Sequence, residues 1–151
     1  MQLTGKHILN AQPSLIWNML MDPDTLVRII PGITKLECIS DHFFKSVLDI
    51  KFGPVSGSFT GNLQMENISD QKGFTLKAQQ NGSIGTVNTF IQISLIPIAE
   101  NQTEIAFDGN IELSGLLATV GKYAIESVSD TLTRQFFINM EKELPSEPKV
   151  H

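Results

Sequence analysis

The sequence has few of the residues that metal sites and nucleophilic catalysis require. Its 151 residues include three histidines, one cysteine, one tyrosine and one tryptophan. The lone Cys38 excludes an internal disulfide and favours a cytoplasmic setting, and no histidine pair has the spacing of metal ligands. Neither a G-x-S-x-G motif nor a phosphate-binding glycine loop is present. We therefore expect no cofactor, no metal and no enzyme that depends on several His or Cys groups.

Basic residues and long apolar runs are also scarce. Eleven Lys and Arg face sixteen Asp and Glu, a net charge of −5, which argues against nucleic acid as a partner. The N-terminus lacks the basic and apolar regions of a signal peptide. No stretch reaches the roughly 18 apolar residues of a transmembrane helix. The expectation is a cytoplasmic protein with peripheral membrane contact at most, transient and at the inner face of the cell membrane.

Phenylalanine, glycine and aliphatic residues are plentiful instead. There are nine Phe and eleven Gly, and apolar residues make up 41% of the chain. A chain of this length forms one domain and can bury about 70% of its unfolded surface. We predict a single ligand-binding domain over residues 1–144 and a flexible, polar tail over 145–151.

The hydrophobic periodicity predicts an α+β fold. A strand at 3–9 precedes two short helices, at 15–21 and 22–28, and six strands with a period of two follow within 33–113. A helical period then covers 114–144. Strands joined by short turns pair antiparallel, so one long sheet is expected to wrap around the last helix.

Small residues recur on the predicted inward face of this sheet, and the facing helix is expected to place Gly121 and Ala124 at its centre. One interpretation is geometric, because glycines let strands bend and small helix residues allow close packing. The other is an apolar cavity, because small residues facing small residues leave volume unfilled. The small inward residues are Ser46, Gly57, Gly61, Ala78, Thr89 and Gly109.

Few polar or aromatic groups stand out as site candidates. His7 is predicted to be a hydrogen-bonded core histidine, and His42 a solvated turn residue. Cys38 is predicted to be a small buried group. Arg28 either holds a polar ligand head at the mouth of the cavity or is solvated on a helix, with the second preferred. Phe137 is expected to pack against a neighbouring segment, with an exposed contact surface as the alternative.

Three stretches of the chain resemble the carbon monoxide dehydrogenase CoxG family, of the START-like (SRPBCC) superfamily. The resemblance covers about residues 3–144. The opening stretch has a helix begun by proline and containing Trp, a D-P turn and an I-P-G end. The middle stretch matches K-x-G-P-V-x-G-x-F-x-G, and the last has a glycine-rich helix start and a Phe pair. The matching residues are Pro13, Trp17, Asp22-Pro23, Ile30-Pro31-Gly32, Lys51–Gly61, Ser114–Gly121 and Phe136-Phe137.

The resemblance implies a helix-grip fold with a hydrophobic tunnel between the sheet and the C-terminal helix. Family members are associated with molybdenum-containing carbon monoxide dehydrogenases and related hydroxylases. They are implicated in recruiting that enzyme to the membrane or in carrying a quinone to it, and they are not the redox catalyst. Membrane-anchored members often have a C-terminal extension, and this sequence lacks that segment after residue 144.

We therefore predict a non-catalytic protein that holds a quinone or lipid and serves a molybdenum-containing dehydrogenase. One alternative is a small cyclase-like enzyme that uses His7, Arg28 or Tyr123, and another is an assembly factor without a ligand. The predicted ligand contacts are apolar or small residues between the sheet and the helices. They are Leu26, Ile29, Ile30, Phe59, Leu76, Ile91, Phe107, Leu117, Val120, Gly121, Ala124 and Val128.

Overall fold

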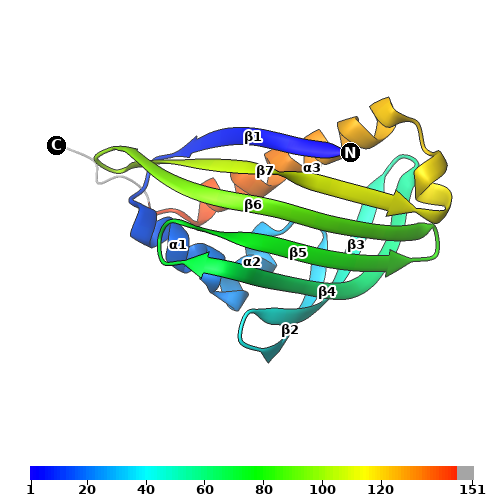
Figure 1. Cartoon of the computed structure of the whole chain (residues 1–151), viewed down its shortest axis with the longest axis horizontal. Coiled ribbons are helices and arrows are strands. Elements are labelled where there is room, and N and C mark those ends of the chain that lie inside the picture. The colour runs from blue at the N-terminus through cyan, green and yellow to red at the C-terminus, as the bar shows by residue number, and fades with distance from the viewer. Residues whose placement is uncertain (146–151) are drawn as a thin grey trace.

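One curved antiparallel sheet forms the body of the molecule, and the computed structural model describes residues 1–145 of it (Figure 1). The predicted tail therefore lies outside the described residues from position 146 onward. Within the described part, seven strands are arranged in the order β1-β7-β6-β5-β4-β3-β2, so the first strand closes one edge beside the last. The strands are β1 (Gln2–Leu9), β2 (Ile33–Ser40), β3 (Phe43–Phe52), β4 (Val55–Ser69), β5 (Gly73–Gly82), β6 (Gly85–Ala99) and β7 (Gln102–Ser114).

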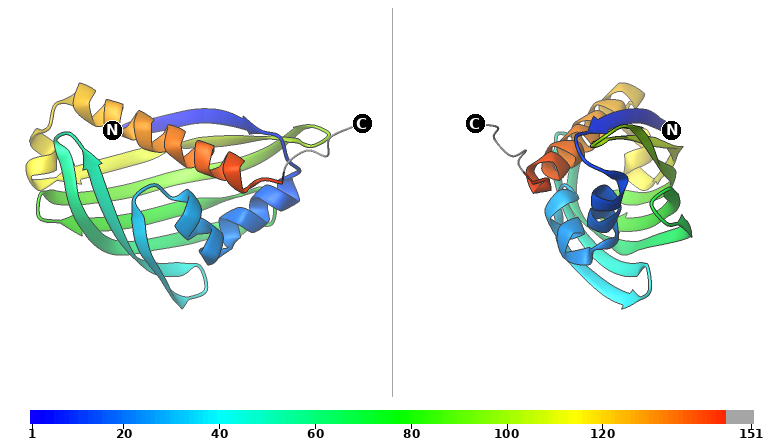
Figure 2. Two further views of the ribbon diagram at one scale, coloured as in Figure 1. Left: turned by 180° about the vertical axis from the view of Figure 1, so that it is seen from behind. Right: turned by 90° about the vertical axis from the view of Figure 1, so that its left-hand side faces the viewer.

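The helices lie on the concave side of the sheet, as the end-on view in Figure 2 shows. The two short helices begin at prolines, where the missing N–H costs no hydrogen bond. The predicted α+β arrangement, with the sheet wrapped around the last helix, is confirmed. The helices are α1 (Pro13–Met21), α2 (Pro23–Ile29), a 3₁₀ turn η1 (Gly115–Thr119) and α3 (Lys122–Glu143).

Asp22 joins α1 to α2 and caps the second helix. Its carboxylate accepts a hydrogen bond from the Thr25 hydroxyl at 2.8 Å and from the Asp24 backbone N–H at 3.3 Å. These bonds, that from the Thr25 hydroxyl first, lower the pKa of Asp22. Because the native pKa is lowered, the ionised cap stabilises the fold above the unfolded-state pKa. That contribution is lost as the pH falls through the native value.

We expect Asp22→Ala to reduce the free energy of unfolding by about 1 kcal/mol near neutral pH, and by less in acid. Urea denaturation over an acid-to-neutral pH series measures this difference. Asp22→Asn is the matched control, because it keeps a capping oxygen without a titrating group. A difference between Asp22→Ala and the unmodified protein that is constant with pH would contradict the assigned cap.

The concave face of the sheet follows the predicted alternation, and its apolar side chains form two separate clusters. The larger cluster includes Leu9 and Phe74 with the buried side chains of α1, α2 and the end of α3. The smaller cluster has Ile50, Phe59 and Leu117 as its buried members. The middle of the concave face lies between these clusters, where the small residues predicted to face inward are concentrated.

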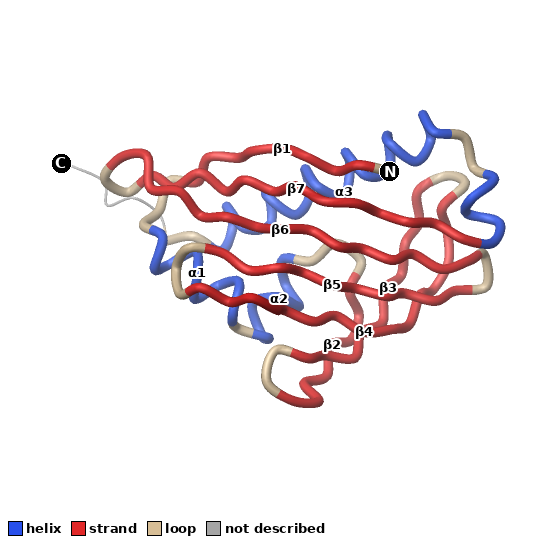
Figure 3. The backbone as a smooth tube through the Cα atoms, in the orientation of Figure 1, coloured by secondary structure: helices blue, strands red, loops and turns tan. Residues whose placement is uncertain are grey.

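The predicted continuous helix over 114–144 is wrong at its start. Gly115 has a φ of +70°, a left-handed conformation that turns the chain away from β7. The turn η1 then ends at Val120, which is extended, and Gly121 is the N-cap of α3. Figure 3 shows the loop between η1 and α3. The break lets the chain reverse at the sheet edge while Leu117, 1% exposed, enters the smaller cluster.

The buried face of α3 also differs from the predicted one. Its buried side chains are Ile125, Phe137 and Met140, and Ala124 and Val128 are half-buried. Gly121 is exposed, and a Cβ placed on it would meet no atom within 4 Å. It therefore does not lie at the centre of a helix that faces the sheet. A helical phase does not carry through η1 and the loop, where a turn of about 100° per residue does not apply.

Candidate functional site

The middle of the concave face is lined by small and polar side chains. Ser46 of β3, Gly61 of β4 and Gln80 of β5 are paired across neighbouring strands and form one row. Ala78 and Thr89 are paired in the next row, on β5 and β6. Few of these side chains can fill the space beneath α3, so this interval is the part of the core with the least apolar packing.

Gln80 is the polar centre of this interval. It is 6% exposed, and its Nε2 donates to the Ser46 hydroxyl oxygen at 2.7 Å and to the Asn62 carbonyl at 3.4 Å. Its Oε1 is buried without a hydrogen-bond partner among the described residues. A buried acceptor without a partner costs free energy and needs an explanation.

A groove of about 850 Å³ opens between β1, β7, η1 and the start of α3. Ile111 and Leu113 line its sheet side, and the predicted contacts Leu117 and Val120 line its far end. At its rim, Lys122 and Glu126 form an ion pair at 3.8 Å between Nζ and Oε1. Volumes of roughly 300–1,000 Å³ are typical of small-molecule sites, so the groove is large enough for an apolar ligand.

A second hollow of about 300 Å³ lies on the other side of α3. It separates the tip of the β3–β4 hairpin, at Phe52 and Pro54, from the helix. The predicted contacts Ala124 and Val128 line the helical side. Hollows therefore flank the N-terminal half of α3, whereas Phe137 and Met140 bury its C-terminal half in the larger cluster.

The other predicted contacts are distributed through the core. Leu26 and Ile29 of α2 are buried in the larger cluster, and Ile30, Leu76 and Phe107 pack against it. Phe59 belongs to the smaller cluster.

Ile91 is buried on β6 and pairs with Leu76 and Gly109, in the row beside Ala78 and Thr89. It therefore lies at the border of the interval between the clusters. Gly121 lies on the outside, at the N-cap of α3.

The titratable candidates lie away from this interval. His7 Nε2 is 2.8 Å from Glu141 Oε1, and its ring stacks on Phe137 with 4.3 Å between centroids. The predicted hydrogen bond of His7 is confirmed, but its side chain is 34% exposed and is not a core group. The packing predicted for Phe137 is also confirmed, because that side chain is buried.

Arg28 and Tyr123 face solvent. Arg28 Nε donates to Glu143 Oε1 at 2.9 Å, and this bond raises the pKa of the guanidinium. The preferred interpretation of Arg28 as a solvated helix residue is therefore confirmed. Tyr123 is 86% exposed at the start of α3. These positions do not bring a titratable side chain into the interval between the clusters.

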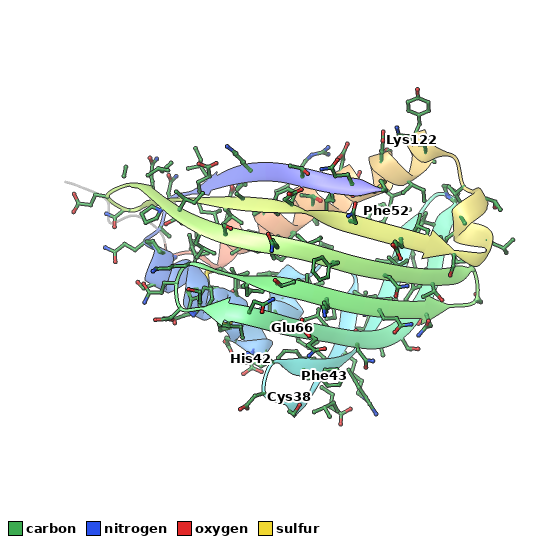
Figure 4. The ribbon with its side chains drawn as sticks, in the orientation of Figure 1. Cys38, His42, Phe43, Phe52, Glu66 and Lys122 are labelled. Atoms are coloured by element: carbon green, nitrogen blue, oxygen red, sulfur yellow. The ribbon has the colours of Figure 1, made fainter. Side chains whose placement is uncertain are left out.

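Cys38 is exposed, so its prediction as a buried group is wrong. Figure 4 shows it on strand β2. Because β2 is an edge strand of the described sheet, it has a neighbouring strand on one side only. His42 is exposed with a φ of +58°, which confirms the predicted turn residue.

Gln80 and Ile125 are inward-facing residues that the sequence analysis does not single out. Gln80 has a signal, since it continues the alternation of Leu76 and Ala78 on β5. Ile125 has none, because its phase depends on where α3 begins. Among residues 1–145, His, Cys, Asp and Glu form no group of three that could hold a metal ion. In the same range, no helix combines the length and apolar character needed to cross a membrane.

A curved antiparallel sheet that grips a C-terminal helix defines the START-like, helix-grip class of protein. A START superfamily protein from Mycobacterium smegmatis aligns with a TM-score of 0.69 at 13% identity, over 94% of this chain and 95% of that one. The aromatase/cyclase Zhui from Streptomyces sp. R1128 aligns with a TM-score of 0.71 at 10% identity, over 95% and 92%. At these identities the likeness shows the fold alone.

The chain belongs to the carbon monoxide dehydrogenase CoxG family, whose model matches residues 5–145. A conserved protein from Geobacillus kaustophilus is similar in both sequence and structure. It aligns with a TM-score of 0.92 at 27% identity, over 95% of this chain and 94% of that one. No match was found among curated proteins.

Proposed function

We propose that this protein is a non-catalytic carrier that holds a quinone or lipid between the sheet and α3. The observation that carries this proposal is the division of the concave face into two apolar clusters, with small residues between them. The groove of about 850 Å³ beside α3 supports it, because it offers a route from the surface to this interval. Ile111 and Leu113 line the groove and belong to the concave face of β7.

Burial of apolar surface would provide the affinity of such a carrier. A ligand that hides about 400 Å² gains on the order of 10 kcal/mol at about 25 cal/mol per Å². The cost of ordering the ligand offsets part of that gain. A ligand with a long apolar part therefore binds without any charged group in the site.

The positions of the titratable side chains favour a carrier over an enzyme. His7 and Arg28 pair with Glu141 and Glu143 near the end of α3, and Tyr123 is exposed. A cyclase-like mechanism would need one of these groups beside the bound substrate. The family takes its name from carbon monoxide dehydrogenase, and this supports a molybdenum-containing dehydrogenase of that type as the partner. The proposed setting is the cytoplasm, with transient contact at the inner face of the membrane.

Native mass spectrometry of the protein purified from cells without detergent tests the proposal. We expect one apolar molecule per chain, which organic extraction releases and which a quinone or lipid standard identifies. The stripped protein should then bind added decylbenzoquinone. A chain that carries no apolar molecule and fails to bind this probe would contradict the carrier function, and a stable complex with a dehydrogenase alone would favour the assembly factor.

A further inference from the structure

The unpaired oxygen of Gln80 is the one buried polar side-chain atom without a hydrogen-bond partner among the described residues. It lies in the interval between the two apolar clusters. We infer that Ser46 and Gln80 form a polar subsite that recognises a hydroxyl group on the bound apolar ligand. This inference rests on the proposed carrier function and deepens it, because it states which chemical form of the ligand the site selects.

The row of paired residues explains how the subsite is built. Gly61 stands between Ser46 and Gln80 in the register and has no side chain, so the Gln80 amide reaches across β4 to the Ser46 hydroxyl. A Cβ on Gly61 would collide with the Gln79 carbonyl oxygen. Close approach of β4 and β5 therefore requires glycine at this position, and the same glycine leaves the space that the amide uses.

The neighbours of Gln80 determine which end of its amide is unpaired. A backbone carbonyl only accepts hydrogen bonds, so the Asn62 carbonyl must face the NH₂ group of the side chain. The Ser46 hydroxyl oxygen accepts from the same nitrogen at 2.7 Å. Both partners therefore occupy the donor end, and the carbonyl end of the amide remains as a buried acceptor.

An acceptor in an apolar interior discriminates between ligands by their hydrogen atoms. A ligand hydroxyl donates to Gln80 Oε1 and removes the cost of the unpaired acceptor. A ligand carbonyl in the same place sets two acceptors against each other and leaves both unpaired. For a quinone skeleton, the hydroxyl form is the reduced hydroquinone. The site is therefore expected to prefer the reduced form, or an alcohol, over the oxidised form.

The burial of both side chains restricts this subsite to a ligand that enters the core. Ser46 is 3% exposed and Gln80 is 6% exposed. The side chains on either side of the row are apolar, with Phe59 in the smaller cluster and Leu63 in the larger. One hydroxyl with apolar surface on both sides is the chemistry that this arrangement matches.

Anaerobic binding of decylhydroquinone and decylbenzoquinone to the stripped protein tests the inference, because the two probes share one skeleton. We expect the reduced probe to bind about tenfold more tightly, which corresponds to one good hydrogen bond. Gln80→Leu should remove this preference by weakening the reduced probe, and it should still bind the oxidised probe. Gln79→Leu is the matched control, because Gln79 is exposed on the same strand, and it should keep the preference.

The outcomes separate this inference from the carrier function. Equal binding of both probes, unchanged in Gln80→Leu, would overturn the subsite and leave the carrier function standing, as expected if a buried water pairs with Oε1. A preference for the oxidised probe would also overturn it. Failure of both probes to bind the unmodified protein would overturn the carrier function, and the subsite with it. Thermal melting of Gln80→Leu confirms that a lost preference does not reflect unfolding.

Discussion

Met140→Ala is expected to reduce the free energy of unfolding by about 2–5 kcal/mol, the range for deleting a fully buried large aliphatic side chain. Met140 is 0% exposed and lies in the larger cluster with Phe137 and the residues of α1 and α2. In α3, only Ile125 is buried outside this C-terminal pair. The truncation therefore leaves a cavity at the point where α3 is held against the rest of the molecule.

Urea denaturation followed by circular dichroism measures this effect. Lys142→Ala is the matched control, because Lys142 lies in the last turn of the same helix and is exposed. The control should change the free energy of unfolding by less than about 0.5 kcal/mol. A loss below about 1 kcal/mol for Met140→Ala would show that α3 does not depend on this contact.

Ala78→Phe is expected to weaken binding of an apolar probe by at least about tenfold while the protein stays folded. Ala78 lies on the concave face of β5, between Leu63 and Thr89 in the register. A phenyl group there occupies the interval that the proposed ligand would fill. Overpacking of an interior costs typically about 1–3 kcal/mol, but the small neighbouring residues leave room for the added ring.

Gln79→Phe is the control for this substitution. It adds the same ring to the same strand, on the exposed convex face. Titration of the stripped proteins with decylbenzoquinone, followed by native mass spectrometry, compares the variants, and thermal melting confirms that both fold. Undiminished binding by Ala78→Phe would move the ligand away from the middle of the concave face.

Much of the fold follows from local patterns that the sequence displays. The period of two on β3 to β7 assigns each side chain to a face, and Asn81-Gly82 and Gly53-Pro54 mark turns between strands. Pro13 predicts the start of α1 to the residue. The motifs of the CoxG family add the topology, because they join these elements in one known order.

The errors arise where burial depends on distant segments. The exposure of Cys38 follows from the position of β2 at the sheet edge, which no local pattern encodes. The sheet-facing side of α3 follows from where the chain leaves η1, so Ile125 replaces Gly121 and Ala124 as the inward residue. A helical phase is reliable only within one uninterrupted helix.

The sequence by itself determined the secondary structure, the face of each strand and the family, because periodicity and motifs are local properties of the chain. The scarcity of His, Cys and basic residues likewise excluded whole classes of site before folding. Only the tertiary structure decided that two apolar clusters leave an interval between them, and that Gln80 Oε1 is unpaired among the described residues within it. Both features depend on which side chains meet across strands far apart in the sequence, and packing, not periodicity, sets those contacts.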